Sequence, residues 1–152
     1  MLEIKKLGPQ MEQALTVFFK DISQGDYAQY FYPYEFTPKS ARELCNLSGK
    51  DLHYVLTNNN IILGHGMLRG WDEGYSIPSL GIVIHPDFAN QGLGSLFIRF
   101  LHFAAWQEEA SYIRLSVHKQ NEVAVNLYRK FGYVFTNKND NEFIGLLTRG
   151  NK

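Results

Sequence analysis

The sequence has almost none of the features typical of secreted, membrane-bound or metal-cluster proteins. Cys45 is the only cysteine among 152 residues, so neither an intramolecular disulfide nor a thiolate metal cluster can form. No run of about 18 apolar residues is present. The first residues, MLEIKKLG, also lack the apolar core of a signal peptide. We therefore expect a soluble, cytoplasmic protein that contains no metal and does not attach to a membrane.

An excess of charge of either sign is also absent. Lys and Arg together number 15, as do Asp and Glu, so the formal net charge is zero. Without a basic tract, binding to nucleic acid or to an anionic membrane has no electrostatic support. The length suits a single domain over residues 1–152, which is large enough to bury a core without cross-links.

Helical periodicity is clear in four segments. Apolar spacing predicts helices over 11–22, 38–47, 93–109 and 121–131. Thr37 is placed to cap the second helix, and Gly132 to end the fourth. In the last helix we expect one apolar face, made by Val123, Ala124, Leu127, Tyr128 and Phe131. In the third, we expect the face made by Leu93, Leu96, Phe97, Phe100, Leu101, Ala104 and Ala105.

Strand patterns fill the rest of the chain. We expect strands over 2–7, 51–57, 61–70, 79–85, 112–118, 133–137 and 142–149, with a hairpin turn at 58–60. The segment 79–85 is almost entirely apolar, as in a strand buried on both faces. The order β-α-α-β-β-β-α-β-α-β-β predicts one mixed α/β domain with helices packed on a sheet.

Two glycines open the third helix, in the stretch HPDFANQGLGSLFIRFL (85–101). Glycine within a helix costs about 1 kcal/mol relative to alanine, so Gly92 and Gly94 need a reason. A tight turn is one; the other is a pyrophosphate bound to the first-turn amides. Two common phosphate motifs are excluded, because a Rossmann loop would need glycine at Phe97 and a Walker A loop would need a lysine.

A second stretch, NEVAVNLYRKFGY (121–133), favours a bound pyrophosphate over a tight turn as the reason for the two glycines. Together the two stretches resemble the GCN5-related N-acetyltransferase (GNAT) superfamily. That family carries Q/R-x-x-G-x-G/A after its fourth strand and N-x-x-A-x-x-L-Y-x-x-x-G-F/Y after its fifth. The second motif matches at every key position, whereas the Gln/Arg position of the first falls on Ala89. The resemblance covers 79–136 and implies a GNAT-like fold with a splayed central sheet.

The resemblance implies acetyl-CoA as co-substrate, held mainly by backbone groups. The pantetheine arm would lie along the fourth strand and the pyrophosphate on the glycine loop. Asn121 would reach the cofactor from the next helix, although its position also suits a plain N-cap. The lost side chain at Ala89 implies weaker binding, not its absence. The implied cofactor-binding residues are Ile82, Val83, Ile84, Ala89, Asn90, Gln91, Gly92, Leu93, Gly94, Ser95 and Asn121.

Tyr128 is the catalytic residue that the resemblance implies. A phenol with a pKa near ~10 can protonate a leaving thiolate whose conjugate acid has a pKa near ~8.5. Packing beside Leu127 and Phe131 is the alternative. The base is less defined, because the glutamate that many family members carry on the fourth strand falls on Pro78 here. Glu73 is our candidate, with Asp72, His65, His85 or a chain of waters as alternatives.

The acceptor would lie beside the turn that precedes the fourth strand. Its expected walls are the aromatic stretch Tyr27–Phe36, within which we select Tyr32, together with Arg69, Trp71 and Tyr75. Core packing of that stretch is equally compatible with the sequence. We expect acetyl transfer to a primary amine of a small molecule, an amino sugar being one option. Acetylation of a protein or peptide, a non-catalytic acyl-CoA sensor, and a homodimer are all left open.

Overall fold

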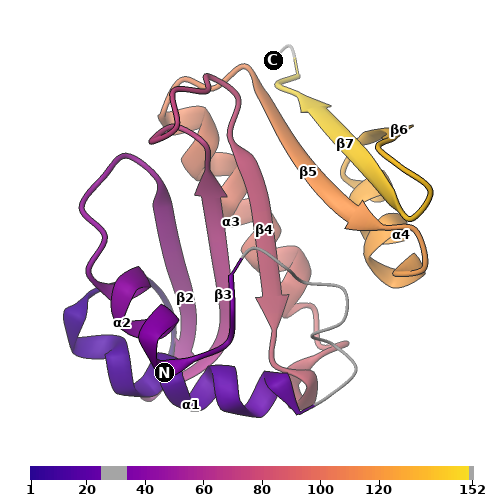
Figure 1. The fold of residues 1–152 in the computed structure, drawn as a ribbon. Helices are drawn as coiled ribbons and strands as arrows, with labels where there is room; N and C mark the ends of the chain where they lie inside the picture. Colours follow the sequence, from indigo (N-terminus) through magenta and orange to yellow (C-terminus); the bar gives the residue numbers. More distant parts are fainter. Residues whose placement is uncertain (25–33, 151–152) are drawn as a thin grey trace.

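A computed structural model describes residues 1–24 and 34–150, which form one seven-stranded mixed sheet with α-helices on both faces (Figure 1). The strand order across the sheet is β1-β2-β3-β4-β5-β7-β6, which confirms the predicted mixed α/β fold. The strands are β1 (Leu2–Lys6), β2 (Leu52–Asn58), β3 (Ile61–Arg69), β4 (Ser79–Ile84), β5 (Tyr112–His118), β6 (Val134–Asn137) and β7 (Glu142–Thr148). The helices are α1 (Glu12–Ser23), α2 (Pro38–Cys45), α3 (Leu93–Gln107) and α4 (Glu122–Lys130), with short 3-10 turns η1 (Pro9–Met11) and η3 (Pro86–Phe88).

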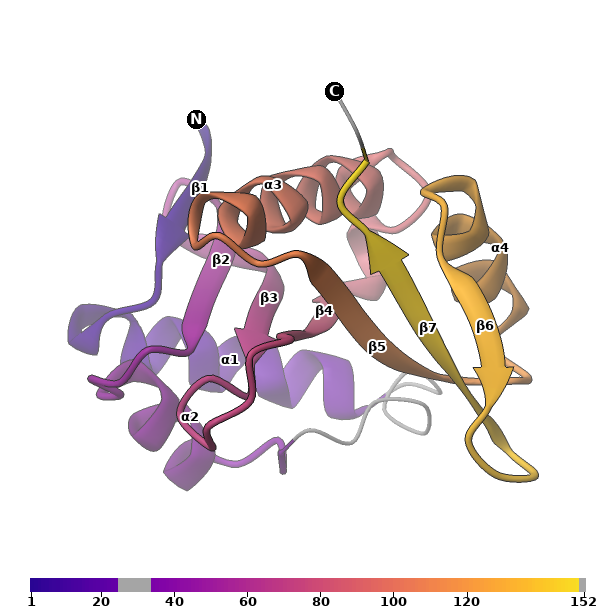
Figure 2. The ribbon, with the colours of Figure 1, turned by 90° about the horizontal axis from the view of Figure 1, so that it is seen from above.

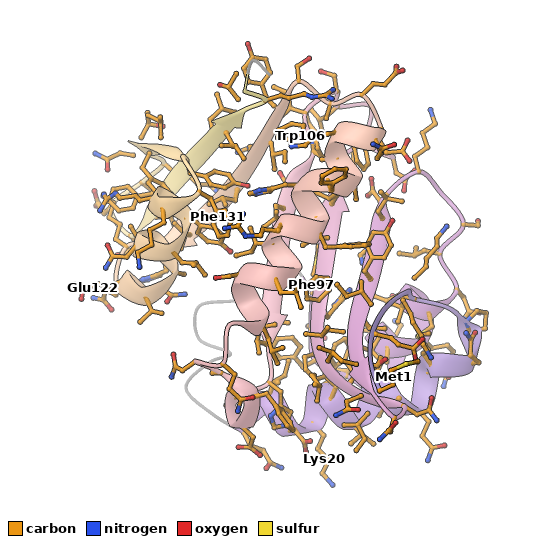
Figure 3. The ribbon with its side chains drawn as sticks, turned by 180° about the vertical axis from the view of Figure 1, so that it is seen from behind. Met1, Lys20, Phe97, Trp106, Glu122 and Phe131 are labelled. Carbon is orange, nitrogen blue, oxygen red and sulfur yellow. The ribbon has the colours of Figure 1, made fainter. Side chains whose placement is uncertain are left out.

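The sheet separates two apolar cores. Helices α1 and α2 cover one face, and α3 and α4 lie on the other (Figure 2). Residues of the α1/α2 core include Leu15, Phe18, Phe19, Val55 and Val83. The larger core on the other face joins α3 and α4 to the central strands through residues such as Leu80, Phe97, Leu101, Leu115 and Tyr128. Figure 3 shows α3 running across the back of the sheet, with Phe97 and Trp106 along its length.

The sheet opens between its two central parallel strands. On one side β4 pairs with β3 over its whole length, from Ser79 opposite Arg69 to Ile84 opposite Gly64. On the other side it pairs with β5 at a single position, Ser79 opposite Arg114. Beyond that position the two strands diverge (Figure 1). The splayed central sheet that the resemblance implied is therefore present.

Local capping signals in the sequence fix several element boundaries. Thr37 accepts a hydrogen bond from the Ser40 amide at 3.1 Å, and Asn121 accepts one from the Ala124 amide at 3.4 Å, as N-caps of α2 and α4. Gly132 ends α4 with φ +101°, a conformation that side chains disfavour. These three predictions are confirmed.

Two predictions of buried helix faces need correction. Val123 is 76% exposed, and Val125 is buried in its place. The buried face of α4 is centred on Val125 and Tyr128, and Val123 lies two residues, or about 200° of helical rotation, away from Val125. On α3, Leu96 is 45% exposed, whereas Ile98 is buried for the same rotational reason. The boundaries also shift slightly: the helix expected from residue 11 begins as η1, and α1 itself starts at Glu12.

Candidate functional site

The open edge of β4 presents backbone groups to the gap. The Arg114 amide donates to the Pro78 carbonyl at 3.0 Å, and the His85 amide donates to the Leu63 carbonyl on β3 at 2.7 Å. Because backbone groups alternate in direction along a strand, those of Ile82 and Ile84 point toward β5 and those of Val83 toward β3. The gap is therefore lined by the amides and carbonyls of Ile82 and Ile84, available to a molecule lying along the strand.

The glycine loop leads from the end of β4 into an uncapped helix. Gly92 is the N-cap residue of α3 and is left-handed, with φ +82°. No side chain of the described residues caps this helix, so within that part of the chain the amides of its first turn have neither helical nor side-chain partners. A Cβ built on Gly92 would meet no atom of residues 1–24 and 34–150 within 4 Å. The glycine is thus required for its backbone conformation, and the space beside it is open to a ligand.

Asn90, two residues earlier, is also left-handed, with φ 62°. It forms part of a compact turn that brings η3 into α3. Ala89 closes η3, where its amide donates to the Pro86 carbonyl at 3.2 Å. The missing Gln/Arg side chain therefore leaves the turn intact.

Tyr128 projects from α4 into the core that α3 and α4 share. Its side chain is buried, and its ring lies edge-on to that of Tyr133 at 5.5 Å. The Tyr133 hydroxyl contacts Nε2 of His102 at 2.9 Å, and burial raises the pKa of Tyr133. The neighbouring Leu127 side chain reaches the glycine loop, since its Cδ2 would lie 4.0 Å from a Cβ on Gly94. Helix α4 thus contacts both the loop and the core behind the open edge.

A cavity of about 440 Å³ lies at the other end of β4. It is formed by the end of β3, the starts of β4 and β5, and the turn between β3 and β4. Three residues selected from the sequence, Glu73, Arg69 and Tyr75, share this cavity. Its lining is Arg69, Gly70, Glu73, Tyr75, Ser76, Ile77, Ser79 and Arg114.

Asp72, next to Glu73, has a structural environment. Its carboxylate accepts hydrogen bonds from the amides of Lys50 and Asp51 at 2.6 and 3.2 Å. These bonds hold the pKa of Asp72 below its ordinary value. In return Asp51 accepts from the amides of Gly70 and Asp72. The pair fastens the β3–β4 turn to the start of β2, which leaves Glu73 as the acidic residue of the cavity.

Beneath the α1/α2 face lies a buried polar chain. The Tyr34 hydroxyl contacts Nδ1 of His65, and Nε2 of His65 contacts Nδ1 of His53 at 3.2 Å. Burial, the charge of Arg69 and the neighbouring His53 hold the pKa of His65 well below its ordinary value. Burial and Arg69 also lower the pKa of His53, to about 4. Both imidazoles are therefore neutral at pH 7, and the chain is a fixed network beside Arg69.

The other histidine considered from the sequence, His85, has a structural position. Its Nδ1 accepts from the Asp87 amide at 3.1 Å, and its Nε2 faces the Asp21 carboxylate of α1 at 3.2 Å. It connects α1 to the turn that precedes the glycine loop.

The structure groups the selected residues at the two ends of β4. The predicted cofactor-binding residues lie along the β4 edge, through the glycine loop and at the start of α4, except Val83. The backbone groups of Val83 point to β3 and its side chain is buried in the α1/α2 core, so its expected place on the open edge is corrected. Glu73, Arg69 and Tyr75 lie at the cavity. Trp71 packs against the larger core, and Tyr32 lies outside the described residues. Ser79 and Arg114, which also line the cavity, were missed. Among residues 1–24 and 34–150 no group of three or more metal-ligating side chains could hold a metal ion, and no helix is long and apolar enough to cross a membrane.

The family model of the acetyltransferase (GNAT) family matches residues 18–133. Among solved structures, the chain is similar to a GNAT-family acetyltransferase from Streptococcus pneumoniae, with 22% identity, a TM-score of 0.81, and 99% and 100% of the two chains covered. It is also similar to the PaiA N-acetyltransferase from Thermoplasma acidophilum, solved in complex with coenzyme A. The identity is 17%, the TM-score is 0.78, and 98% of this chain and 99% of that chain are covered. A third similar structure is the ribosomal-protein-S18-alanine N-acetyltransferase from Escherichia coli. The identity is 18%, the TM-score is 0.74, and 97% of this chain and 94% of that chain are covered. No curated protein sequence matches the chain.

Proposed function

The chain belongs to the acetyltransferase (GNAT) family, and on this premise we propose that it moves the acetyl group of acetyl-CoA to the primary amine of a small molecule. One observation carries the proposal. Past Ser79 the β4 edge has no strand partner among the described residues. It leads at one end into the first turn of α3, which no described side chain caps, and at the other end toward a cavity. A long anionic thioester and a compact acceptor could therefore meet along one strand.

The residues fit the co-substrate through backbone groups. Ile82 and Ile84 would pair with the amide groups of the pantetheine arm, as an added strand would. The amides from Gln91 to Ser95 would receive the pyrophosphate, favoured by the positive end of the α3 dipole. The space beside Gly92 allows the phosphates to approach that closely.

The chemistry needs two protons removed from the acceptor nitrogen and one supplied to the CoA sulfur. In our proposal Glu73 accepts the proton that the acceptor's ammonium loses, and the neutral amine nitrogen attacks the thioester carbonyl carbon. The C–S bond then breaks and Tyr128 donates its proton to the leaving CoA sulfur, while the second proton, lost by the nitrogen as the amide forms, returns to the Tyr128 oxygen. The place of Tyr128 in the core that also contains Ile84 of β4, and the location of Glu73 in the cavity, support these roles.

The size of the cavity favours a small acceptor over a protein. Sites for small molecules generally enclose about 300–1,000 Å³, and this cavity of about 440 Å³ lies in that range. The test is to incubate the protein with acetyl-CoA and a panel of amino sugars, polyamines, amino acids and peptides. Thiol release and the mass of the acetylated product are then measured. We expect one small-amine class to be acetylated far faster than the peptides. Acetyl-CoA binding without transfer to any amine would instead indicate a non-catalytic sensor.

Tyr128→Phe tests the proposed acid, because it removes the hydroxyl and keeps the ring. General acid catalysis typically contributes about 10²–10⁴-fold, so kcat should fall by about that factor while acetyl-CoA affinity is unchanged. Tyr133→Phe is the matched control from the same ring pair. It should reduce stability, because His102 loses its partner, and leave kcat nearly unaltered. A Tyr128→Phe variant with wild-type kcat would show that Tyr128 only packs.

A further inference from the structure

Three polar residues form one row across the central strands at the cavity. Arg69 on β3 lies opposite Ser79 on β4, and Ser79 lies opposite Arg114 on β5. Ser79 is the only β4 residue in register with both neighbouring strands. The two arginines therefore flank it, one strand away on each side, with Cα atoms about 10 Å apart.

All three side chains are on the α1/α2 face of the sheet. Their neighbours Leu68, Leu80, Ile113 and Leu115 are buried in the core on the α3 face. Because side chains alternate along a strand, Arg69, Ser79 and Arg114 point to the opposite side. There all three line the same cavity. The row is thus a set of converging donors, two guanidinium groups with a hydroxyl between them.

The described lining of the cavity carries more positive than negative charge. Among the described residues it contains two arginines and one acidic residue, Glu73. Neither Arg114 nor Glu73 forms an ion pair with any residue in the described parts of the chain. Guanidinium groups bind carboxylate and phosphate with paired hydrogen bonds, so two of them around one hydroxyl form a favourable anion site.

We propose that Arg69, Ser79 and Arg114 bind an anionic group of the acceptor, which is a primary amine that also carries a carboxylate or a phosphate. This inference rests on the proposed function, whose acceptor it specifies. Glu73, on the same cavity wall, provides the complementary negative charge for the acceptor's ammonium group.

The row is separate from the region proposed for the phosphates of CoA. The six residues of β4 span about 20 Å and place Ser79 and the glycine loop at opposite ends of the strand. The exposed edge begins near Ile82, three residues or about 10 Å from Ser79. An acceptor with its amine and anion within about 10 Å of each other could therefore span from the row to the reacting thioester.

The test compares acceptors that differ by one charge. One pair is 4-aminobutanoate and 4-aminobutanamide, and the other is 3-aminopropyl phosphate and 3-aminopropanol. Values of kcat/KM are measured at saturating acetyl-CoA for the wild type, Arg114→Gln and Arg114→Lys. Arg42→Gln, which changes an exposed arginine on α2 outside the cavity, is the control.

We expect the wild type to prefer the charged member of at least one pair by tenfold or more. A preference within the aminobutanoate pair indicates that the site binds a carboxylate, and a preference within the aminopropyl phosphate pair indicates that it binds a phosphate. Loss of a hydrogen bond to a charged group changes affinity by about 10- to 100-fold, so Arg114→Gln should remove most of the preference by raising KM. Arg114→Lys should retain part of it, and Arg42→Gln all of it. A wild type without preference, or a preference that survives Arg114→Gln, overturns the anion site.

A binding measurement keeps this inference distinct from the proposed function. The same four amines are titrated by calorimetry into protein saturated with CoA, which needs no turnover. If no amine is acetylated but the charged amines bind the wild type at least tenfold more tightly than Arg114→Gln, acetyl transfer fails and the anion site stands. If the neutral amines are acetylated as well as the charged ones and bind equally, the function stands and the anion site is wrong.

Discussion

The buried histidines predict a loss of stability on mild acidification. His53 and His65 lie in the chain that ends at Tyr34, and His102 contacts Tyr133 in the other core. Burial lowers the pKa of His53 and of His102 to about 4, and it holds that of His65 well below its ordinary value. In the unfolded chain each histidine has a pKa near ~6.5.

The direction of the change in folding stability with pH follows from which state, folded or unfolded, binds more protons. Between pH 6.5 and 4 the unfolded chain takes up protons at these histidines and the folded protein does not, so acid favours unfolding. His53 and His102 should each remove about 2 kcal/mol of stability between pH 7 and pH 5, and His65 acts in the same direction. A domain is typically stable by about 5–15 kcal/mol, so the combined loss is a large part of the total. Full stability should be present above pH 6.5.

The assay is urea unfolding at pH 7, 6, 5.5 and 5, with the denaturant slope monitored to ensure that the unfolding reaction is unchanged. His102→Gln keeps a partner for the Tyr133 hydroxyl and removes one titrating group. It should reduce the average pH slope between pH 7 and pH 5 by about 1 kcal/mol per pH unit. If the wild type is as stable at pH 5 as at pH 7, these imidazoles are protonated in the folded protein and the assignment of neutral buried histidines is wrong.

Two further predictions concern the glycine loop. Gly92→Asn should lower acetyl-CoA affinity at least tenfold by calorimetry, because asparagine tolerates the left-handed backbone while its side chain occupies the open space. Gly74→Asn is the matched control for stability, because Gly74 also has a left-handed backbone (φ +92°) and no described atom near its Cβ position. Equal acetyl-CoA affinity in Gly92→Asn and the wild type would mean that Gly92 serves only the backbone turn. Ala89→Arg should tighten CoA binding at low salt and lose the gain at high salt through screening. Identical affinities at low salt would show that the missing side chain is unimportant.

The order of elements was predictable because its signals are local. The Asn and Thr caps, Gly132 and the alternating strand at 112–118 each act within one turn or one strand. The glycine loop could be located for the same reason, since a left-handed N-cap followed by an uncapped helix depends on a few adjacent residues. The direction of a helix face was less certain, as Val123 shows, because one helical residue changes the direction by 100°.

The cavity could not be assembled from the sequence. Ser79 and Arg114 are neighbours because β4 and β5 touch at one residue, and tertiary packing sets that register. The chain from Tyr34 through His65 to His53 similarly joins residues far apart in sequence whose patterns carry no mutual signal. The sequence places Glu73, Arg69 and Tyr75 near one turn, whereas Arg114 has only the pattern of an ordinary polar residue on a strand.

The opening between β4 and β5 also has a consequence for the protein without its ligand. Although β4 lies in the middle of the sheet, its side toward β5 has no strand partner among the described residues after Ser79. The residues of β4 that follow Ser79 are apolar or glycine. Such edges tend to pair with strands of other chains. A bound pantetheine arm would occupy the edge and stabilise the folded state by mass action. Hydrogen exchange at the Ile82 and Ile84 amides, compared with and without CoA, measures whether the edge is covered. Fast exchange that slows only with CoA means that the ligand covers the edge, and slow exchange in both states means that the edge is protected without it.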